Sequence, residues 1–314
     1  MYFRKFAVSI FFLFMAMATI AQDSNPQENN SKIFVKIIGG YAFMGPGSYT
    51  ESNRTSGGKF EENKNKFGEG YRVGAGVGFI LNENINIGLD VVYHKGLDLD
   101  ITQTIENQRD SIGNSYIRTT NQDITTTYTN TILNFIPNIT FKAISKPTYY
   151  VYNRVGIIIA LPLELGTTTK GFTSYQTKNT PIAPPYDYSN NYTYDYDGYY
   201  SQDPAFGFQA ALGVQFILTE KLRFFTEIEA SSLVLNPKEL VYDPYVYTST
   251  TVRTVPGPPA TISSSVDERP RQYFYQKSGV LKTDNGTDQV TIYTSQKKIP
   301  ANSLSLNIGL ALRL

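Results

Sequence analysis

Eight segments of this chain alternate between apolar and polar residues, each over roughly ten positions. In Tyr71–Leu81 the odd-numbered residues are apolar, and the even-numbered ones include Arg72 and three glycines. Successive side chains of a β-strand point to opposite faces, so this pattern predicts strands with one apolar face each. The segments are 33–44, 71–81, 85–94, 131–142, 149–161, 205–218, 222–230 and 303–314.

The polar faces of these segments are poor water-facing surfaces, because they consist largely of Gly, Ala, Asn and Gln with isolated charges. The apolar faces carry aromatic residues at several ends, namely Tyr41, Tyr71, Tyr93 and Tyr149. Ten-residue strands with an apolar outer face and aromatic ends are typical of strands that cross a bilayer. A mean hydropathy of −0.27 would suggest a soluble protein, but the alternation indicates a membrane barrel.

Short and long connections alternate along the chain. Residues 82–84, 219–221 and about six residues around Lys146 join neighbouring segments, whereas the other connections are roughly 25, 30, 40 and 65 residues long. Sorting of this kind is typical of outer-membrane barrels. The sequence therefore predicts an all-β fold, an eight-stranded antiparallel up-and-down transmembrane β-barrel. Its turns and both termini are expected in the periplasm, and its long loops outside the cell.

The N-terminus has the features of a secretory signal. Arg4 and Lys5 precede the apolar run 6–18, and small residues around Ala21 suit a signal peptidase. We expect a signal peptide at 1–21 and one barrel domain at 22–314. The chain has no cysteine and hence no disulfide, and its 28 basic and 27 acidic residues give no reason to expect a nucleic-acid partner.

The signal ending IAQ, the strands YRVGAGVGF and RVGIIIA, and the terminal stretch LSLNIGLALRL together resemble the small outer-membrane β-barrel proteins of the OmpA/OmpX type found in Bacteroidota. The usual final aromatic residue of that family is Leu314 here. The resemblance implies an outer-membrane location. It also implies contact with outer-membrane lipid and with the barrel-assembly machinery during biogenesis, but no activity.

An eight-stranded barrel has an interior just wide enough for side chains to fill it. Charges that point inward should pair, because an unpaired buried charge is expensive. We interpret the inward charges, including Lys36, as a structural network that blocks the lumen; a narrow channel for a small solute is the alternative. The predicted network comprises Arg72, Asp90, Lys142, Arg154, Arg223, Glu227, Glu229 and Arg313.

Catalysis would have to involve His94, the sole histidine, which lies four residues from Asp90 on the same face. One His–Asp pair is not a triad, so we expect a structural histidine and no enzyme; a lipid-active enzyme is the less favoured alternative. The acids 187, 195, 197 and 203 lack the ordered spacing of a calcium loop. We therefore expect no metal and no cofactor.

The stretch YDYSNNYTYDYDGYY, residues 186–200, lies in the third long connection. Tyrosine among Ser, Asn and Gly is the composition of antibody combining sites, so it predicts binding of another outer-membrane protein or an external ligand. The alternative is that the rings pack on neighbouring loops or lie at the lipopolysaccharide boundary as ordinary interfacial tyrosines. The candidate residues are Tyr186, Tyr188, Tyr192, Tyr194, Tyr196, Tyr199 and Tyr200.

A possible modification site lies in the second long connection. Asp110-Ser111-Ile112 resembles the O-glycosylation motif of Bacteroidota, which makes Ser111 a candidate acceptor. A motif of three residues has little specificity, so intact mass is the measurement that decides.

Overall fold

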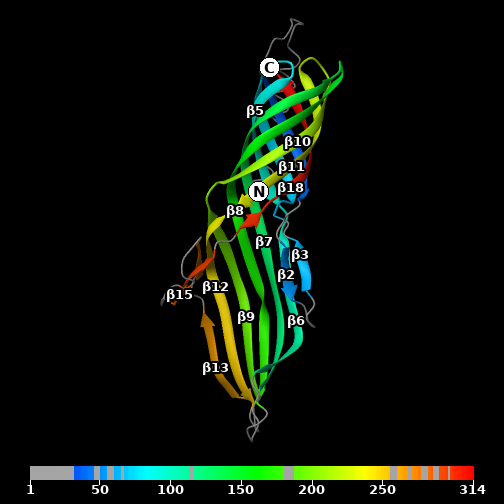
Figure 1. The fold of residues 1–314 in the computed structure, drawn as a ribbon. Coiled ribbons are helices and arrows are strands. Elements are labelled where there is room, and N and C mark those ends of the chain that lie inside the picture. Colours follow the sequence, from blue (N-terminus) through cyan, green and yellow to red (C-terminus); the bar gives the residue numbers. More distant parts are fainter. Residues whose placement is uncertain are drawn as a thin grey trace.

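A computed structural model describes residues 32–45, 50–54, 60–64, 67–112, 116–179, 187–254, 260–267, 271–276, 282–285, 290–295 and 298–314 (Figure 1). The predicted signal peptide, 1–21, lies outside these residues. Within the described ranges no helix is long and apolar enough to cross a membrane.

All the regular elements in the described ranges are β-strands. They are β1 (Ile33–Met44), β2 (Thr50–Arg54), β3 (Phe60–Lys64), β4 (Gly70–Ile80), β5 (Ile85–Gly96), β6 (Leu99–Ile112), β7 (Tyr116–Ser145), β8 (Tyr149–Asn179), β9 (Asp187–Gln202), β10 (Ala205–Ile217), β11 (Leu222–Leu235), β12 (Pro237–Thr254), β13 (Ala260–Asp267), β14 (Arg271–Gln276), β15 (Lys282–Asn285), β16 (Val290–Ser295), β17 (Ile299–Pro300) and β18 (Ser303–Arg313).

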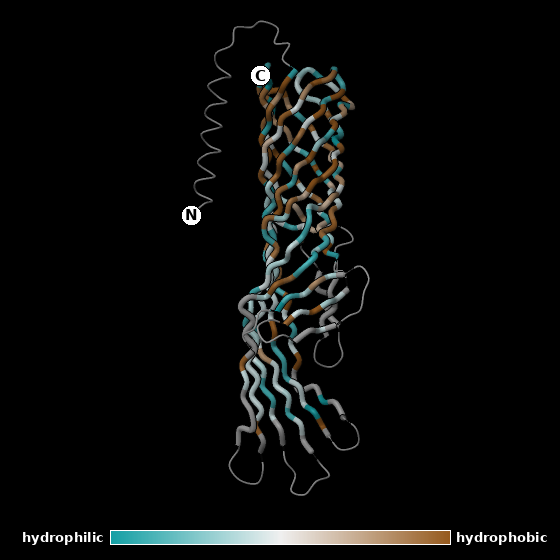
Figure 2. The backbone as a smooth tube through the Cα atoms, turned by 90° about the vertical axis from the view of Figure 1, so that its left-hand side faces the viewer, coloured by the Kyte–Doolittle hydropathy of each residue, from teal (hydrophilic) through white to brown (hydrophobic). Residues whose placement is uncertain are grey.

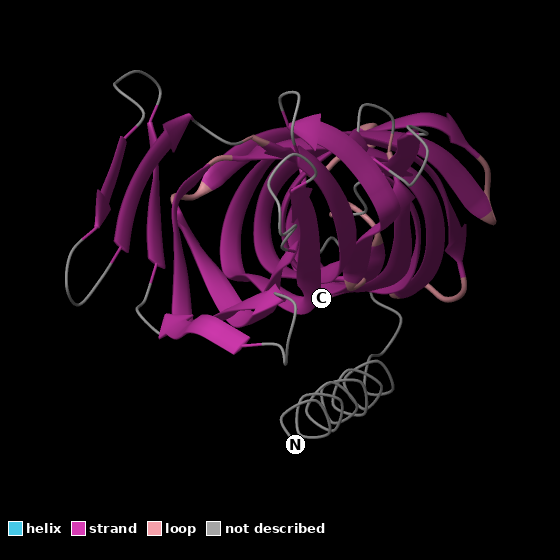
Figure 3. Cartoon of the chain, turned by 90° about the horizontal axis from the view of Figure 1, so that it is seen from below, coloured by secondary structure: helices cyan, strands magenta, loops and turns pink. Residues whose placement is uncertain are grey.

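Eight of the strands pair in a closed circuit, which we call the ring. β1 pairs with β4, and the pairing continues through β5, β7, β8, β10 and β11 to β18, which pairs again with β1. Every one of these pairings is antiparallel. Figure 3 shows the strands curving around the enclosed space. The ring therefore has no free edge.

Tight turns join the ring strands at one end only. Backbone hydrogen bonds close the turns at 81–84, 146–148 and 218–221, for example from Leu81 N to Ile85 O at 3.0 Å. Leu314 lies at the same end, where its N–H donates to Ile33 O at 3.1 Å. We call this end of the ring the short-turn end.

The long strands continue past the other end of the ring. β7 has 30 residues and β8 has 31; their inner halves belong to the ring, and their outer halves pair with β6 and β9. We call β6, β9, β12–β16 and residues 116–130 and 165–179 the projecting sheet (Figure 1). At about 3.3 Å per residue, the outer half of β7 alone spans on the order of 50 Å.

The structure corrects the prediction that the long connections are loops. The main sheet contains 16 strands in the described ranges, more than the eight of the ring, because most of these connections form strands. Their Thr- and Tyr-rich sequences suit a pleated sheet. The neighbouring outer halves of β7 and β8 then supply ladder partners along their whole length.

Hydropathy separates the two parts of the molecule, with hydrophobic residues concentrated in the ring (Figure 2). On β10 the side chains of Phe206 and Phe208 point outward and are each 71% exposed, whereas Gly207 and Gln209 are buried. The apolar face of the ring strands is therefore the outer face, as the alternation predicts. A cluster of buried apolar residues lies inside the ring and extends to the end opposite the short-turn end, which we call the outer end.

Candidate functional site: the lumen and the projecting sheet

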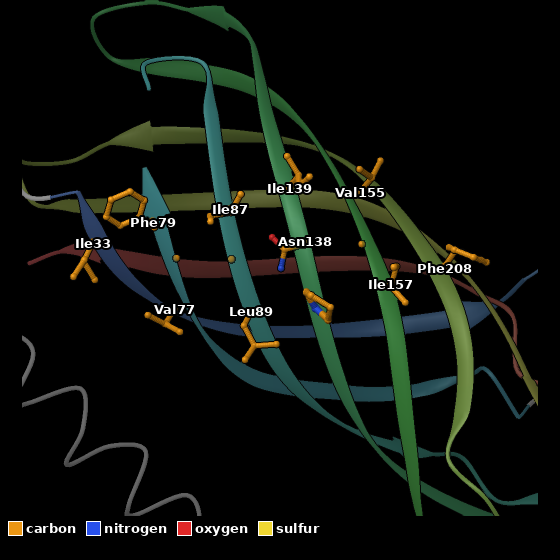
Figure 4. Close-up of a pocket in the computed structure, with 14 residues that line it drawn as sticks. Ile33, Val77, Phe79, Ile87, Leu89, Asn138, Ile139, Val155, Ile157 and Phe208 are labelled. Carbon is orange, nitrogen blue, oxygen red and sulfur yellow. The ribbon is translucent and has the colours of Figure 1, made fainter. Parts of the chain in front are cut away.

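The outer wall of the ring is apolar over several strands. A furrow of about 820 Å³ crosses β4, β5, β7 and β8, floored by Gly78, Gly88 and Gly156. Figure 4 shows the side chains that border it, which come from six strands. Such a continuous apolar surface is unsuited to water. The labelled apolar residues are Ile33, Val77, Phe79, Ile87, Leu89, Ile139, Val155, Ile157 and Phe208.

Arg154 on β8 lies at the centre of the lumen. Its guanidinium forms ion pairs with Asp90 on β5 and with Glu227 and Glu229 on β11, the last at 3.0 Å. All four side chains are buried. Alternation places them there, because each lies opposite the outward-facing apolar residues of its own strand.

Two further cations complete this network. Lys36 Nζ lies 2.9 Å from Asp90 Oδ2, and Arg72 pairs with Glu229 and donates to Ser305 Oγ at 2.9 Å. Three cations and three carboxylates therefore balance in the middle of the lumen. We call these six residues the lumen network.

Uncharged groups donate further hydrogen bonds to Glu227, whereas Asp90 Oδ1 has no partner among the described residues. Tyr152 donates its hydroxyl to Glu227 at 2.9 Å, and the Asn307 amide donates to Glu227 at 3.2 Å. Tyr152, Ser305 and Asn307 were not among the predicted site residues. Alternation does indicate that their side chains face the lumen, since Tyr152 shares its face with Arg154 and the other two alternate with the leucines of β18.

The outer end of the lumen is filled by apolar side chains. Phe67, which comes from the segment before β4, packs there with residues of β7, β8, β11 and β17. A cavity of about 30 Å³ remains beside this cluster, which is the volume of one water molecule. The members of the cluster include Phe67, Ile132, Ile158, Leu165, Leu233, Leu235 and Ile299.

Three of the predicted network residues lie elsewhere. Lys142, Arg223 and Arg313 gather at the short-turn end of the lumen around the ring of Tyr150. The Lys142 Nζ lies 5.0 Å and the Arg223 Cζ 5.7 Å from the centre of that ring. The predicted set of eight charges is therefore divided between two places in the lumen.

His94 is buried near the outer end of the lumen, opposite Arg72 on the paired strand. Ser231 and Ser303 line the same small cavity, but their hydroxyls bond to each other at 2.7 Å. Within the described part of the chain, His94 Nε2 has no hydrogen-bond partner. Among the described residues, His94 Nε2 is therefore not hydrogen-bonded to a serine, as a Ser–His pair for nucleophilic catalysis would be.

The tyrosine-rich stretch forms β9, in the middle of the projecting sheet between β8 and β12. Two of its rings pack against rings of neighbouring strands: Tyr192 on Tyr175 at 5.6 Å and Tyr196 on Tyr242 at 4.7 Å between centroids. Tyr200 stacks on Tyr275 at 6.4 Å. These contacts match the alternative that the rings pack within the protein.

The other predicted tyrosines differ from these. Tyr194 hydrogen-bonds Thr173 on β8, and Tyr188 lies in β9 paired with Thr177. Tyr199 points to the opposite face of the sheet and is 60% exposed. Tyr186 lies outside the described residues.

Burial of the tyrosine cluster changes its ionisation. Desolvation is the largest cause that raises the pKa of Tyr275, to about 12, and it also raises the pKa of Tyr200 and of Tyr242. A hydrogen bond joins the hydroxyls of Tyr200 and Tyr275. The cluster is therefore neutral at physiological pH.

The acids of β9 lie on the opposite face from the packed rings. Asp197 accepts a hydrogen bond from Thr168 at 2.6 Å, and Asp195 pairs with Lys170 at 3.6 Å. Asp203, just after β9, pairs with Lys238 at 2.7 Å. The described residues include no group of three or more His, Cys, Asp or Glu that could hold a metal ion.

The candidate glycosylation site lies in a strand. Ser111 belongs to β6, where it pairs with Ile117 of β7 close to the tip of that hairpin. Its modification stays a prediction.

No protein-family model and no curated protein sequence matches the chain. The similar solved structures are outer-membrane proteins. The chain aligns with the solid-state NMR structure of AlkL over 92% of its length and 93% of that chain, at 10% identity and a TM-score of 0.31. The protease OmpT of Escherichia coli aligns over 93% and 99%, at 10% identity and a TM-score of 0.27.

A FadL homologue from Pseudomonas aeruginosa aligns over 90% of this chain and 89% of its own, at 6% identity and a TM-score of 0.16. All these TM-scores are too low to carry an argument about the fold or the activity of this chain.

Proposed function

We propose that this protein is a non-enzymatic, eight-stranded β-barrel of the bacterial outer membrane. In this proposal its lumen is closed, and its projecting sheet stands outside the cell. There the sheet binds a partner, either another outer-membrane protein or a surface ligand.

The apolar outer wall of the ring supports the membrane location. A closed circuit of strands satisfies every backbone group without an edge, which is the condition for β-structure in hydrocarbon. The short-turn end would face the periplasm and the long strands the exterior, as in other outer-membrane barrels. The furrow over Gly78, Gly88 and Gly156 would then be filled by lipid acyl chains.

The size of the projecting sheet is the observation that carries the binding proposal. Closing the ring requires only the inner halves of β7 and β8, yet both strands continue for about 15 residues and are joined by further strands. Ordering a residue costs roughly 1–2 kcal/mol of conformational entropy. Ordering a sheet of this extent is therefore expensive, which argues that the sheet has a role beyond closing the ring. One face of the sheet exposes Phe172 and Tyr199.

The lumen supports a non-conducting barrel rather than a channel. The apolar cluster fills the outer end, and the balanced network of Lys36, Arg72, Asp90, Arg154, Glu227 and Glu229 fills the middle.

The binding proposal can be tested by photo-crosslinking in intact cells of the source bacterium. A photoreactive residue at Tyr199 or Phe172 should give a discrete adduct, while one at Leu306, on the outer wall of the ring, should not give that adduct. A deletion of 186–200 is a poor test, because it removes β9 from between β8 and β12. Absence of any adduct from both sheet positions would contradict the proposal.

A further inference from the structure

The short-turn end of the lumen concentrates positive charge. Lys142, Arg223 and Arg313 come from β7, β11 and β18 and line one small cavity with Tyr150. None of the three forms an ion pair with a residue of the described chain. This arrangement differs from the lumen network, in which three cations meet three carboxylates.

Several polar atoms at this place lack partners. Among the described residues, Arg223 Nε, Arg313 Nε and Asn86 Oδ1 are buried without a hydrogen bond. Gln215 Oε1 already accepts the hydroxyl of Tyr150. Donors of two guanidinium groups are therefore available, and each unsatisfied buried group carries a desolvation penalty.

The surrounding acids compensate these cations only in part. Glu83 is the acid whose charge acts on Lys142, and it lies in an exposed turn. Lys146 and Lys221 add positive charge to the turns of the same end, and Glu220 is the other acid of these turns. Like charges held together in a partly buried place destabilise a protein unless an anion joins them.

We propose that Lys142, Arg223 and Arg313 bind a small oxyanion of the phosphate class at the short-turn end of the lumen. Guanidinium groups match the oxygens of phosphate in charge and in geometry, and an ammonium adds a point charge. The cavity of about 30 Å³ admits one oxygen of such an anion.

Phosphate oxygens at this end have two sources, free phosphate ions and the headgroups of phospholipids. Both present non-bridging phosphate oxygens, which share the negative charge, to the three cations. The experiment therefore uses one probe for each source, inorganic phosphate and short-chain dihexanoyl phosphatidylglycerol.

The full-length mature protein, folded in a phosphate-free maltoside detergent, is titrated with each probe. Binding is followed by the thermal unfolding midpoint and by phosphorus NMR line broadening. At least one probe should raise the midpoint of the wild type, since a ligand of the folded state stabilises it by mass action. Response to inorganic phosphate alone identifies the free ion, and response to the lipid identifies the headgroup.

The test variant K142Q/R223Q/R313Q should bind the responding probe at least about tenfold more weakly. The control K95Q/K170Q/K238Q removes the same number of charges from exposed pairs elsewhere, with Glu164, Asp195 and Asp203. Its affinity should stay within about twofold.

Folding of the test variant is checked without any probe. Because the three cations repel one another, the variant should be at least as stable as the wild type in phosphate-free buffer. Should the triple variant fail to fold, the single variant R313Q takes its place, with a smaller loss of affinity. No response of the wild type to either probe, or equal affinity in the folded variant, overturns the proposal.

Discussion

Arg154 is the central residue of the lumen network. Its guanidinium bonds to Asp90, Glu227 and Glu229, and through them it is linked to Lys36 and Arg72. A buried ion pair contributes little net stability when it is complete, but its carboxylates become expensive when the cation is removed. Arg154 therefore holds the lumen network in its charge-balanced form.

Replacing Arg154 with alanine should lower the free energy of unfolding by about 3–5 kcal/mol, because it leaves carboxylates buried without a counter-charge. Urea unfolding of the detergent-solubilised protein measures the effect. Lys170→Ala, which removes an exposed partner of Asp195, is the control and should change stability by less than about 1 kcal/mol. Equal effects of the two substitutions would contradict the role of Arg154.

Tyr275 should make the stability of the projecting sheet depend on pH in the alkaline range. Its pKa is raised by burial to about 12, above the value near 10 of an exposed tyrosine. The folded state therefore holds the phenol proton more tightly, so this stability is complete below about pH 10 and is lost as pH rises through about 12. Phenolate absorbance and near-ultraviolet circular dichroism should show the sheet loosening in that interval.

The matched comparison for this titration is between Tyr275→Phe and Tyr199→Phe. The first substitution should reduce the loss of sheet structure between those pH values, and the second should not, because Tyr199 is 60% exposed. Identical alkaline transitions in the wild type and in Tyr275→Phe would refute the assignment.

At the scale of single elements, Gly171 marks a close approach of β7 and β8. Its φ is +154°, a conformation that other residues rarely adopt, and an added Cβ would meet the carbonyl oxygen of Asp123. Gly166 on the same strand has no such φ, and its nearest neighbour is the flexible hydroxyl of Thr129 at 2.9 Å. The two glycines therefore tolerate alanine differently.

Gly171→Ala should weaken the outer halves of β7 and β8 and leave the ring intact. A strained backbone position of this kind costs on the order of 1–3 kcal/mol. Hydrogen exchange should accelerate in 116–130 and 165–179 but not in β1 or β18. Gly166→Ala is the control and should leave exchange close to that of the wild type; uniform acceleration in both variants would argue against the local mechanism.

The ring strands could be predicted from the sequence, but the projecting sheet could not. β4 spans Gly70–Ile80 where alternation predicts 71–81, since its two faces differ sharply in polarity. In β9 and β12 both faces carry polar or tyrosine residues, so alternation does not reveal which face is buried.

Alternation also predicts the face of a lumen charge but not its height along the strand. Arg72 meets Glu229 although the two are 157 positions apart, and this depends on the registers of several strands between them. The separation of Lys142, Arg223 and Arg313 from the lumen network has the same cause. Alternation alone places all eight charges inside the ring but does not show which of them are in contact.

The molecule as a whole consists of two parts that differ in their packing. The ring has an apolar exterior and a filled interior, and the projecting sheet extends from it through the continuous strands β7 and β8. The two parts therefore share a continuous backbone ladder through β7 and β8.

A filled lumen predicts that the protein does not conduct ions. Planar-bilayer recordings of the purified protein should show no unitary current steps, because apolar side chains and the lumen network occupy the interior. A general porin inserted under the same conditions serves as the positive control. Reproducible steps from the wild type would contradict a closed lumen.

The most direct test of the central claim is the accessibility of single cysteines to a membrane-impermeant maleimide, and the chain has no cysteine of its own. Y199C in the projecting sheet should react in intact cells, K146C in a short turn should react only after permeabilisation, and L306C on the outer wall of the ring should react in neither. That pattern is the one an outer-membrane barrel with an external sheet predicts. Reaction of L306C as fast as Y199C, or of K146C in intact cells, would contradict it.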